Sequence, residues 1–350
     1  MFKPRFCPWR ACAFHRAPQP GFYTSFGSYK PKCRSHPVPR FRCKGCGRTF
    51  SRQTFRADYY DHKPHLNAKL FEYLSSGVGL RESSRKLNLS RHCTELKARK
   101  IGRHLRQLNL NLQGKLPAWA ALQFDELETY EGRRNTRPLT LPMVIETKSR
   151  VILWAESAPI RPRGSMSKKR LAAIESDRRR HGERRDSSQT AIRRTLARAK
   201  RLSTEGTHLH IDTDKKKIYP QIISEVFGDL PITHVRTSSK LVRDVCNPLF
   251  PINQTEALAR DLTSRLRRDS WLTSKRRRWL DVSLHVFIAY RNLVRKRFNK
   301  DAFSAAEKLG WIRRRLSPTE VLGWRQVFGK RSIHPLARKS ESIESVLANS

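Results

Sequence analysis

The sequence predicts a multidomain protein with a small cysteine-rich β lobe, a helical segment, and an α/β domain whose mixed sheet is flanked by helices. Five of the first 46 residues are cysteines, four of them arranged in two close pairs, and two helical patterns follow them. Strand-like and helix-like runs then follow one another as far as about residue 300. A chain of 350 residues can form two or three such domains. We expect boundaries at 1–60, 61–112, 113–300 with a basic insert at 161–201, and 301–350.

The composition points to a polyanionic partner. The chain carries 73 Lys and Arg against 30 Asp and Glu, a formal charge of +43. Such an excess repels itself, and nucleic acid relieves it because each neutralised phosphate releases counterions. The longest apolar stretches, such as DVSLHVFIAY, are shorter than the ~20 residues that span a bilayer. The first residues, MFKPRFCPWR, lack the apolar core of a signal peptide. We therefore expect an intracellular protein with reduced thiols.

The cysteine pairs suit a structural metal. Cys7 and Cys12 are separated by four residues, and Cys43 and Cys46 by two. Four thiolates in two such turns fit tetrahedral zinc, which stabilises lobes too small to fold alone. The aromatic runs at 21–30 and 37–42 resemble short strands, so the arrangement predicts a zinc ribbon. A redox pair would normally begin a helix of a βαβ unit, and free structural thiols are the plain alternative. Possible substitute ligands are Cys33, His15 and His36, whereas Cys93 and Cys246 are expected to be packing residues.

Two helices around a tight turn are predicted between residues 61 and 112. Apolar residues recur at helical spacing over 66–74, SSGVG interrupts the pattern, and LRESSRKLNLS forms a short helix and turn. A longer helix follows from residue 91, with Ser90 placed to cap it. This pattern fits a DNA-binding helix-turn-helix, although an ordinary amphipathic pair with a solvated basic face would look similar. The candidate DNA contacts on the second helix are Arg91, His92, Lys97 and Arg99.

The α/β domain begins with three strand-like runs at 120–128, 139–147 and 149–157. A basic stretch follows and ends in a helical pattern at 187–203. The next runs alternate as strand 207–214, helix 219–228, strand 231–237 and helix 253–268, and a long amphipathic helix is predicted from Trp271 to Arg297. The usual strand order for this layout places the first and fourth strands side by side.

Acidic residues are scarce, so those at the ends of apolar strands are candidates for chemistry. Asp125 lies in the first strand, Asp212 and Asp214 end the fourth, and Glu256 lies in the helix after the fifth. Carboxylates gathered in this way repel one another unless cations lie between them, and two Mg²⁺ ions can clamp a phosphodiester displacement. Taken singly, each residue could equally be a turn cap or a solvated helix side chain.

The chain resembles the bacterial insertion-sequence transposases of the DDE class. The likeness is carried by CPWRAC and RFRCKGCGRTFS, then FDELETY, TDKKKIYPQI and NQTEALARDLTSRL, and extends to LSPTEVLGWRQVFG. The family has a zinc ribbon, a helix-turn-helix and a ribonuclease-H-like core, so the resemblance implies these parts over about residues 5 to 330.

The resemblance also assigns roles to individual residues. Asp125 matches the first carboxylate of the family, and Asp214 the second, because Tyr219 follows it by five residues. Asp212 lacks that spacing but shares the strand face, so the choice between them stays open. Glu256 matches the third, with Arg260 one helical turn further. The sequence departs from the pattern at Lys215, where the family often has glycine, and in its long basic insert.

The implied activity is metal-dependent DNA cleavage and strand transfer by in-line phosphoryl transfer, with two Mg²⁺ ions, or Mn²⁺, and a structural Zn²⁺. The implied partners are double-stranded DNA, as terminal inverted repeats and target, and further copies of the chain, in the bacterial cytoplasm at the nucleoid. Phosphate contacts are expected from Lys215, Lys216, Lys217 and Arg260. Two alternatives are a catalytically inactive, transposase-derived DNA-binding regulator and a basic RNA-associated protein with a zinc ribbon.

Overall fold

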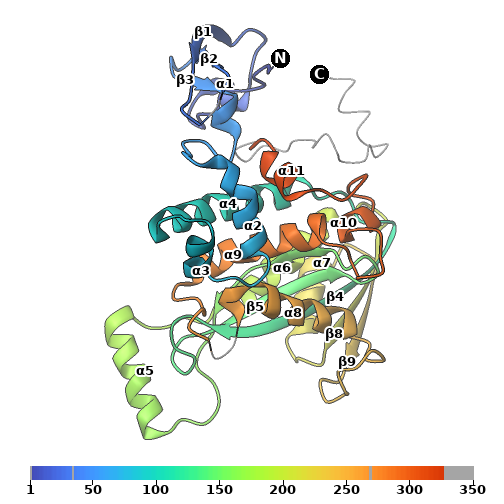
Figure 1. The fold of residues 1–350 in the computed structure, drawn as a ribbon. Coiled ribbons are helices and arrows are strands. Elements are labelled where there is room, and N and C mark those ends of the chain that lie inside the picture. The colour runs from blue at the N-terminus through green and yellow to red at the C-terminus, as the bar shows by residue number, and fades with distance from the viewer. Residues whose placement is uncertain (1, 34, 268–269, 327–350) are drawn as a thin grey trace.

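The computed structural model describes residues 2–33, 35–267 and 270–326. A small β lobe at the N-terminus stands at one end of the molecule, as Figure 1 shows. A group of helices connects it to a larger sheet covered by helices on both faces. No helix among the described residues is both long and apolar enough to cross a membrane.

The N-terminal lobe is a three-stranded antiparallel sheet with one short helix. It contains α1 (Ala13–Arg16), β1 (Tyr23–Tyr29), β2 (Val38–Cys43) and β3 (Thr49–Ser51), in the order β1-β2-β3. Aromatic rings make up most of its interior: Phe22 stacks on Phe50, and Phe50 meets Phe55 edge to face. A core of so few apolar residues is too small to stabilise a lobe of this size without an additional cross-link such as a bound metal.

Three helices follow, α2 (Asn67–Leu74), α3 (Leu80–Lys86) and α4 (Arg91–Asn111). The predicted cap is confirmed, since the Ser90 hydroxyl accepts a hydrogen bond from the backbone N–H of Cys93. The turn between α3 and α4 uses Asn88 at a positive φ of 48°, a conformation that asparagine tolerates. The C-terminal half of α4 packs against α9 (Arg277–Ala289). The two backbones come close at Gly102, where a Cβ would lie 2.7 Å from the carbonyl oxygen of Val282.

The predicted α/β core with a mixed sheet is present. Its strands are β4 (Trp119–Tyr130), β5 (Pro138–Glu146), β6 (Ile152–Ala155), β8 (His208–Asp214) and β9 (Ile232–Thr237), in the order β6-β5-β4-β8-β9. A short strand, β7 (Ala158–Pro159), also pairs with β5. The first three strands are antiparallel, and β4, β8 and β9 are parallel. The first and fourth strands are therefore neighbours, as the sequence predicts. This order and the flanking helices fit a ribonuclease-H-like α/β core.

Two pairs of helices cover the sheet. Helices α6 (Ser188–Leu202) and α7 (Tyr219–Phe227) pack on one face against residues such as Leu122, Phe124 and Ile211. Helices α8 (Phe250–Leu262) and α9 pack on the other face, against Leu127, Met143 and Ile145. The strand order reverses direction at β4, and in open α/β sheets such a point is where ligands bind, outside the carboxyl ends of the strands.

The predicted long helix from Trp271 is wrong at its start. Helix α9 begins at Arg277, and residues 271–276 form turns. The hydroxyl of Thr273 donates to the carbonyls of Arg267 and Ser270, and that of Ser274 donates to Arg276. Short polar side chains compete with helical hydrogen bonds in this way. At the other end α9 continues as a π-helical turn, Tyr290–Val294.

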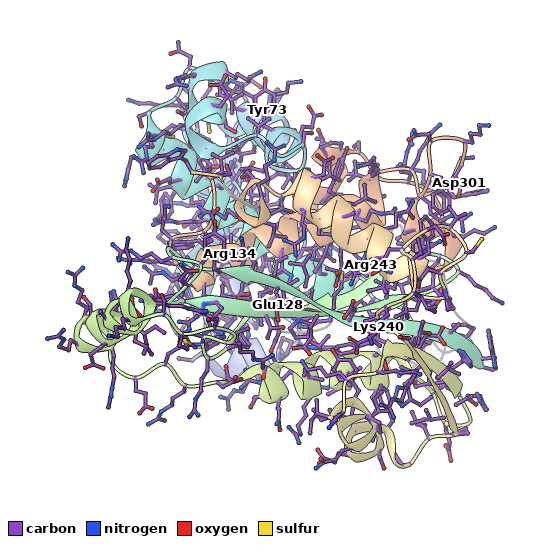
Figure 2. The ribbon with its side chains drawn as sticks, turned by 90° about the horizontal axis from the view of Figure 1, so that it is seen from below. Tyr73, Glu128, Arg134, Lys240, Arg243 and Asp301 are labelled. Atoms are coloured by element: carbon purple, nitrogen blue, oxygen red, sulfur yellow. The ribbon has the colours of Figure 1, made fainter. Side chains whose placement is uncertain are left out.

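The sequence gives no warning of α5 (Lys168–His181), a helix inside the basic insert without a buried residue. Figures 1 and 2 both show it standing clear of the rest of the molecule. The chain then ends its described part with α10 (Ala305–Lys308) and α11 (Pro318–Gly323). Residues 327–350 of the predicted C-terminal segment 301–350 lie outside the described residues.

Candidate functional site

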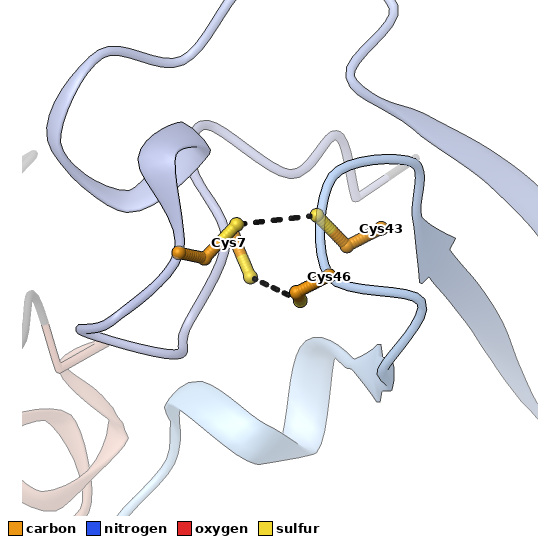
Figure 3. A group of neighbouring side chains, drawn as sticks. Cys7, Cys43 and Cys46 are labelled. Atoms are coloured by element: carbon orange, nitrogen blue, oxygen red, sulfur yellow. Dashed lines mark hydrogen bonds between the residues drawn. The ribbon is translucent and has the colours of Figure 1, made fainter.

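Four cysteines meet in the N-terminal lobe. The Sγ atoms of Cys7, Cys12, Cys43 and Cys46 all lie within 4.8 Å of one another, and Figure 3 shows the side chains facing a common centre. The Cys7–Cys46 and Cys12–Cys43 sulfur pairs are each 3.7 Å apart. A tetrahedral zinc with bonds of about 2.3 Å places its sulfurs roughly 3.8 Å apart. The cluster therefore has the ligand type, number and spacing of a structural zinc site.

The surroundings of these cysteines also fit a metal. Burial raises the pKa of Cys7 and of Cys12, so thiolates here need a compensating positive charge. Burial acts the same way on Cys43, but the backbone N–H groups of Cys46 and Gly45 outweigh it and lower the pKa of that thiol. The proposed substitutes are not in the cluster: Cys33 is exposed, and His15 places Nδ1 2.7 Å from the carbonyl oxygen of Cys7.

The sheet brings Asp125 and Asp214 next to each other. Gln123 of β4 pairs with Asp212 of β8, and the two aspartates lie two residues further along their parallel strands. Because side chains alternate along a strand, Asp125, Asp212 and Asp214 all lie on the same face of the sheet. Helix α8 packs on this face, against β4. The backbone N–H of Lys216 donates to Asp214 Oδ1 at 3.0 Å and fixes this carboxylate at the strand end.

The structure distinguishes the two aspartates of β8. Asp212 lies two residues before the end of β8, and its Oδ1 is 3.0 Å from His210 Nε2. Asp214 instead lines an open pocket of about 240 Å³ together with Asp125. The other residues lining the pocket are Glu126, Glu128, Thr140, Ile160, Arg163, Lys216 and Tyr219. The geometry favours Asp214 over Asp212 as the partner of Asp125.

Helix α8 carries Glu256 under the same face of the sheet. Gln123 holds the start of the helix, because its side-chain nitrogen donates to the Pro248 carbonyl and its oxygen accepts from the Ile252 N–H. Glu256 is buried, and its Oε1 has no hydrogen-bond partner. A buried carboxylate oxygen without a partner is costly in a folded protein. A cation at this place would supply the missing contact.

The electrostatics of the three acids agree with this geometry. Burial and, less strongly, the neighbouring Asp214 charge together raise the pKa of Asp125 to about 6, although the hydrogen bond from the Glu126 backbone N–H acts against them. Burial, then the charge of Asp125, raises the pKa of Glu256 well above its usual value, although Arg260 and Arg243 act against this. Figure 2 marks Arg243, which follows β9. Among the described residues, the four cysteines are the only group of three or more possible metal ligands whose atoms lie within 4.8 Å of one another. The three acids are therefore further apart than the cysteine sulfurs.

These pKa values predict that asparagine at position 125 stabilises the metal-free protein. An aspartate with an unfolded pKa of about 4 and a folded pKa of about 6 contributes stability that is fully present below about pH 4 and lost as the pH rises through about 6. Asp125→Asn removes this loss and should stabilise the fold by on the order of 2 kcal/mol at about pH 7.5. Urea unfolding in EDTA measures the gain, which should shrink at about pH 5. An equal gain at both pH values would contradict the assignment.

A fourth acid, Glu126, escaped the sequence analysis. Its carboxylate is buried on the opposite face of β4 and accepts hydrogen bonds from Thr140 Oγ1 and Tyr219 OH, both at 2.8 Å. It also pairs with the ammonium of Lys216. Lys216 thus links Glu126 to Asp214, because its side chain pairs with Glu126 and its backbone N–H donates to Asp214. The FDELE run contained the signal, because an acid next to Asp125 in a buried strand must lie on the other face.

The candidate DNA contacts differ in their placement. Arg91 and His92 are exposed at the start of α4, and Arg99 lies over the Trp279 ring at 4.1 Å. Lys97 is buried, with its ammonium donating to Asp61, Asn67 and the carbonyl of Lys63, so it has no donor left for a phosphate. Lys215 and Lys217 are exposed, and Arg260 donates to the Glu128 carbonyl at 2.9 Å.

Comparison with known proteins adds little to this description. No family model and no curated protein matches the sequence. Among solved structures, one similar chain is the catalytic domain of Mos1 mariner transposase, at 10% sequence identity and a TM-score of 0.21. The match covers 55% of this chain and 90% of that one. A likeness this weak carries no weight for function.

Proposed function

We propose that the protein is a DDE transposase, which binds the terminal inverted repeats of an insertion sequence and cleaves and rejoins DNA by in-line phosphoryl transfer. One observation carries the proposal: Asp125 and Asp214 lie side by side at the reversal point of the sheet, above a buried Glu256 with an unpartnered oxygen. Asp214 raises the pKa of Asp125, and Asp125 raises that of Glu256, and clusters of acids with perturbed pKa values are typical of functional sites.

The three carboxylates offer oxygen ligands of the kind that Mg²⁺ or Mn²⁺ prefers. When bound, such ions lower the pKa of an attacking water or 3′-hydroxyl and stabilise the departing oxyanion. The residues of the chain provide the frame for this chemistry. Asp125 and Asp214 are held by neighbouring strands and Glu256 by a helix anchored to Gln123, so all three sit on rigid elements.

Glu126 and Lys216 support the frame in our proposal. The ion pair with Glu126 fixes Lys216, and the backbone N–H of Lys216 in turn holds Asp214. Tyr219 and Thr140 complete the hydrogen bonds of Glu126, so its charge is compensated inside the sheet and is not a ligand. Lys215 and Lys217, on either side of Lys216, remain exposed for phosphates.

DNA recognition falls to the N-terminal half of the chain in this proposal. Helices α3 and α4 form the helix-turn-helix, with Arg91 and His92 at the exposed start of α4 and the half-buried Arg99 two turns further along it. Lys97 is not among these contacts because it stabilises the helical group from inside. The zinc ribbon adds contacts to the DNA backbone. Because two DNA ends must be brought together, at least two copies of the chain are required.

Helix α5 is a second DNA contact in this proposal, held as a rigid arm. Arg170 donates to the carbonyls of Asn135, Arg163 and Ser165. Arg184, in the segment between α5 and α6, donates to Glu131 and to the carbonyls of Ile160 and Pro138. Ile160 and Arg163 also line the pocket of Asp125, so the root of the arm lies at the candidate active site.

Removal of the arm's charge should weaken DNA binding in a salt-dependent way. Arg178, Arg179 and Arg180 are exposed at the end of α5, and each neutralised phosphate contributes about 0.9 to the slope of log K against log salt. The triple alanine variant should lower that slope by about 2 to 3. Fluorescence anisotropy with a labelled duplex at several salt concentrations measures it. Glu175→Gln, on the same helix, is the control and should not lower the slope, and an unchanged slope in the triple variant would exclude the arm.

The function is tested with the full chain and labelled duplexes taken from the DNA that flanks its own gene. With Mg²⁺ or Mn²⁺ we expect strand cleavage at the element ends and a joined product, and neither in EDTA. Metal-dependent products on these ends but not on shuffled duplexes would support a transposase. Specific binding without any cleavage under either metal would favour the inactive regulator instead.

A further inference from the structure

One half of a sheet face is left open beside the candidate active site. On the face that carries Asp125 and Asp214, α8 and α9 pack over β4, β5 and β6. The same face of β8 and β9 has exposed or half-exposed side chains instead, and Figure 1 places these strands at the lower right of the sheet. The residues of this open face are Trp119, His208, His210, Asp212, Thr233 and Val235.

On β8 the exposure is confined to one face. Trp119 is 49% exposed and Val235 is 41% exposed. On the opposite face of β8, Leu209 and Ile211 are fully buried by the helices α6 and α7. Trp119 and Val235 therefore leave apolar surface open on this face of the sheet.

The polar groups of the open face are fixed by contacts along the sheet. His210 Nε2 lies 3.0 Å from Asp212, and His208 Nε2 lies 3.0 Å from the hydroxyl of Thr233. The rings of Trp119 and His210 have centroids 6.4 Å apart and planes tilted by 30°. These two neighbouring rings, Trp119 and His210, are called the platform here, because aromatic faces are surfaces on which planar groups can stack.

A lysine lies directly beside the platform. The ammonium of Lys148 lies 4.9 Å from the centre of the Trp119 ring, and the side chain is exposed on the turn between β5 and β6. An exposed lysine can leave the ring for a phosphate while a base takes its place. The platform also continues into the candidate active site, since Asp214 lies two residues beyond Asp212 on the same face of β8.

We propose that this open face binds single-stranded DNA, with bases stacked on Trp119 and His210 and phosphates near Lys148. The inference rests on the proposed function, because the strand would be the one that leaves the candidate active site. Stacking on aromatic side chains combined with nearby cations is the usual way proteins hold unpaired strands. A duplex hides its base faces, so it cannot use the platform.

The test is binding of a labelled single strand, a blunt duplex and a duplex with a single-stranded tail to the full chain, in EDTA. Trp119→Ala should weaken binding of the single strand and of the tailed duplex by about 5- to 100-fold, in line with the loss of one stacked base. Its affinity for the blunt duplex should stay unchanged. Trp271→Ala is the matched control, since Trp271 is 95% exposed and lies in the turn before α9.

Equal affinities of the Trp119→Ala and Trp271→Ala variants for the single strand would overturn the platform. So would an equal loss of blunt-duplex binding in Trp119→Ala, which would mean a general DNA contact or a fold defect. Trp119→Phe keeps a ring and should retain most of the affinity. Because EDTA prevents cleavage, this result is independent of catalysis: a chain that cuts DNA can still fail this test, and a chain that never cuts can pass it.

Discussion

Glu256→Gln and Asp214→Asn should each reduce metal-dependent DNA cleavage by more than about 100-fold, because loss of mere outer-shell partners at metal sites costs 10- to 100-fold. Both changes keep the shape of the side chain and remove one negative charge. Glu256 contributes a buried oxygen without a protein partner, and Asp214 lies beside Asp125 at the end of its strand. The measurement is the rate of nicking on labelled element ends under Mg²⁺.

Asp212→Asn is the matched control for Asp214→Asn. The two aspartates share one strand and one face and lie two residues apart, but Asp212 contacts His210 and Asp214 lines the pocket. Cleavage should survive in the Asp212 variant and be lost in the Asp214 variant. The reverse result would reassign the second ligand, and full activity in both would remove β8 from the mechanism. Asp261→Asn, exposed on α8, serves the same purpose for Glu256.

The sequence predicted the elements of the core well, because their apolar patterns are set by burial on both faces of the sheet. Strands predicted at 207–214 and 231–237 are β8 and β9 within one residue, and the adjacency of the first and fourth strands follows from the layout. The position of Asp125 next to Asp214 needs only that adjacency and the alternation of side chains.

What the sequence could not show depends on contacts between distant segments. The sequence pattern predicts that Lys97 is a surface cation on a basic helix. In the structure its ammonium is enclosed by Asp61, which precedes α2, and by Asn67, the first residue of α2. The role of Glu126 depends on Lys216, ninety residues further on, and periodicity does not report such a pair. Helix α5 has no apolar stripe, so the pattern that identifies helices in a core is missing from it.

Removal of the metal from the cysteine cluster should unfold the N-terminal lobe and leave the α/β core intact. The aromatic core of the lobe is small, and the rest of its cohesion comes from four ligands on two separate turns. Metal binding at such sites supplies folding free energy of roughly 10 kcal/mol or more, so a strong chelator should melt the lobe at ambient temperature. Zinc content, by atomic absorption, should be one per chain in the untreated protein.

Cys43→Ser isolates this effect from other actions of the chelator. Cys43 is fully buried among the other three sulfurs, whereas Cys33 is exposed outside the cluster, so Cys33→Ser is its control. The Cys43 variant should lose the zinc and become sensitive to protease within residues 1–60, while the Cys33 variant should keep both properties. Amide exchange should rise in β1 to β3 and stay low in β4 and β8. Retained zinc in the Cys43 variant would show that the four sulfurs are ordinary packing residues, and exchange spreading into β4 would show that the lobe and the sheet unfold as one unit.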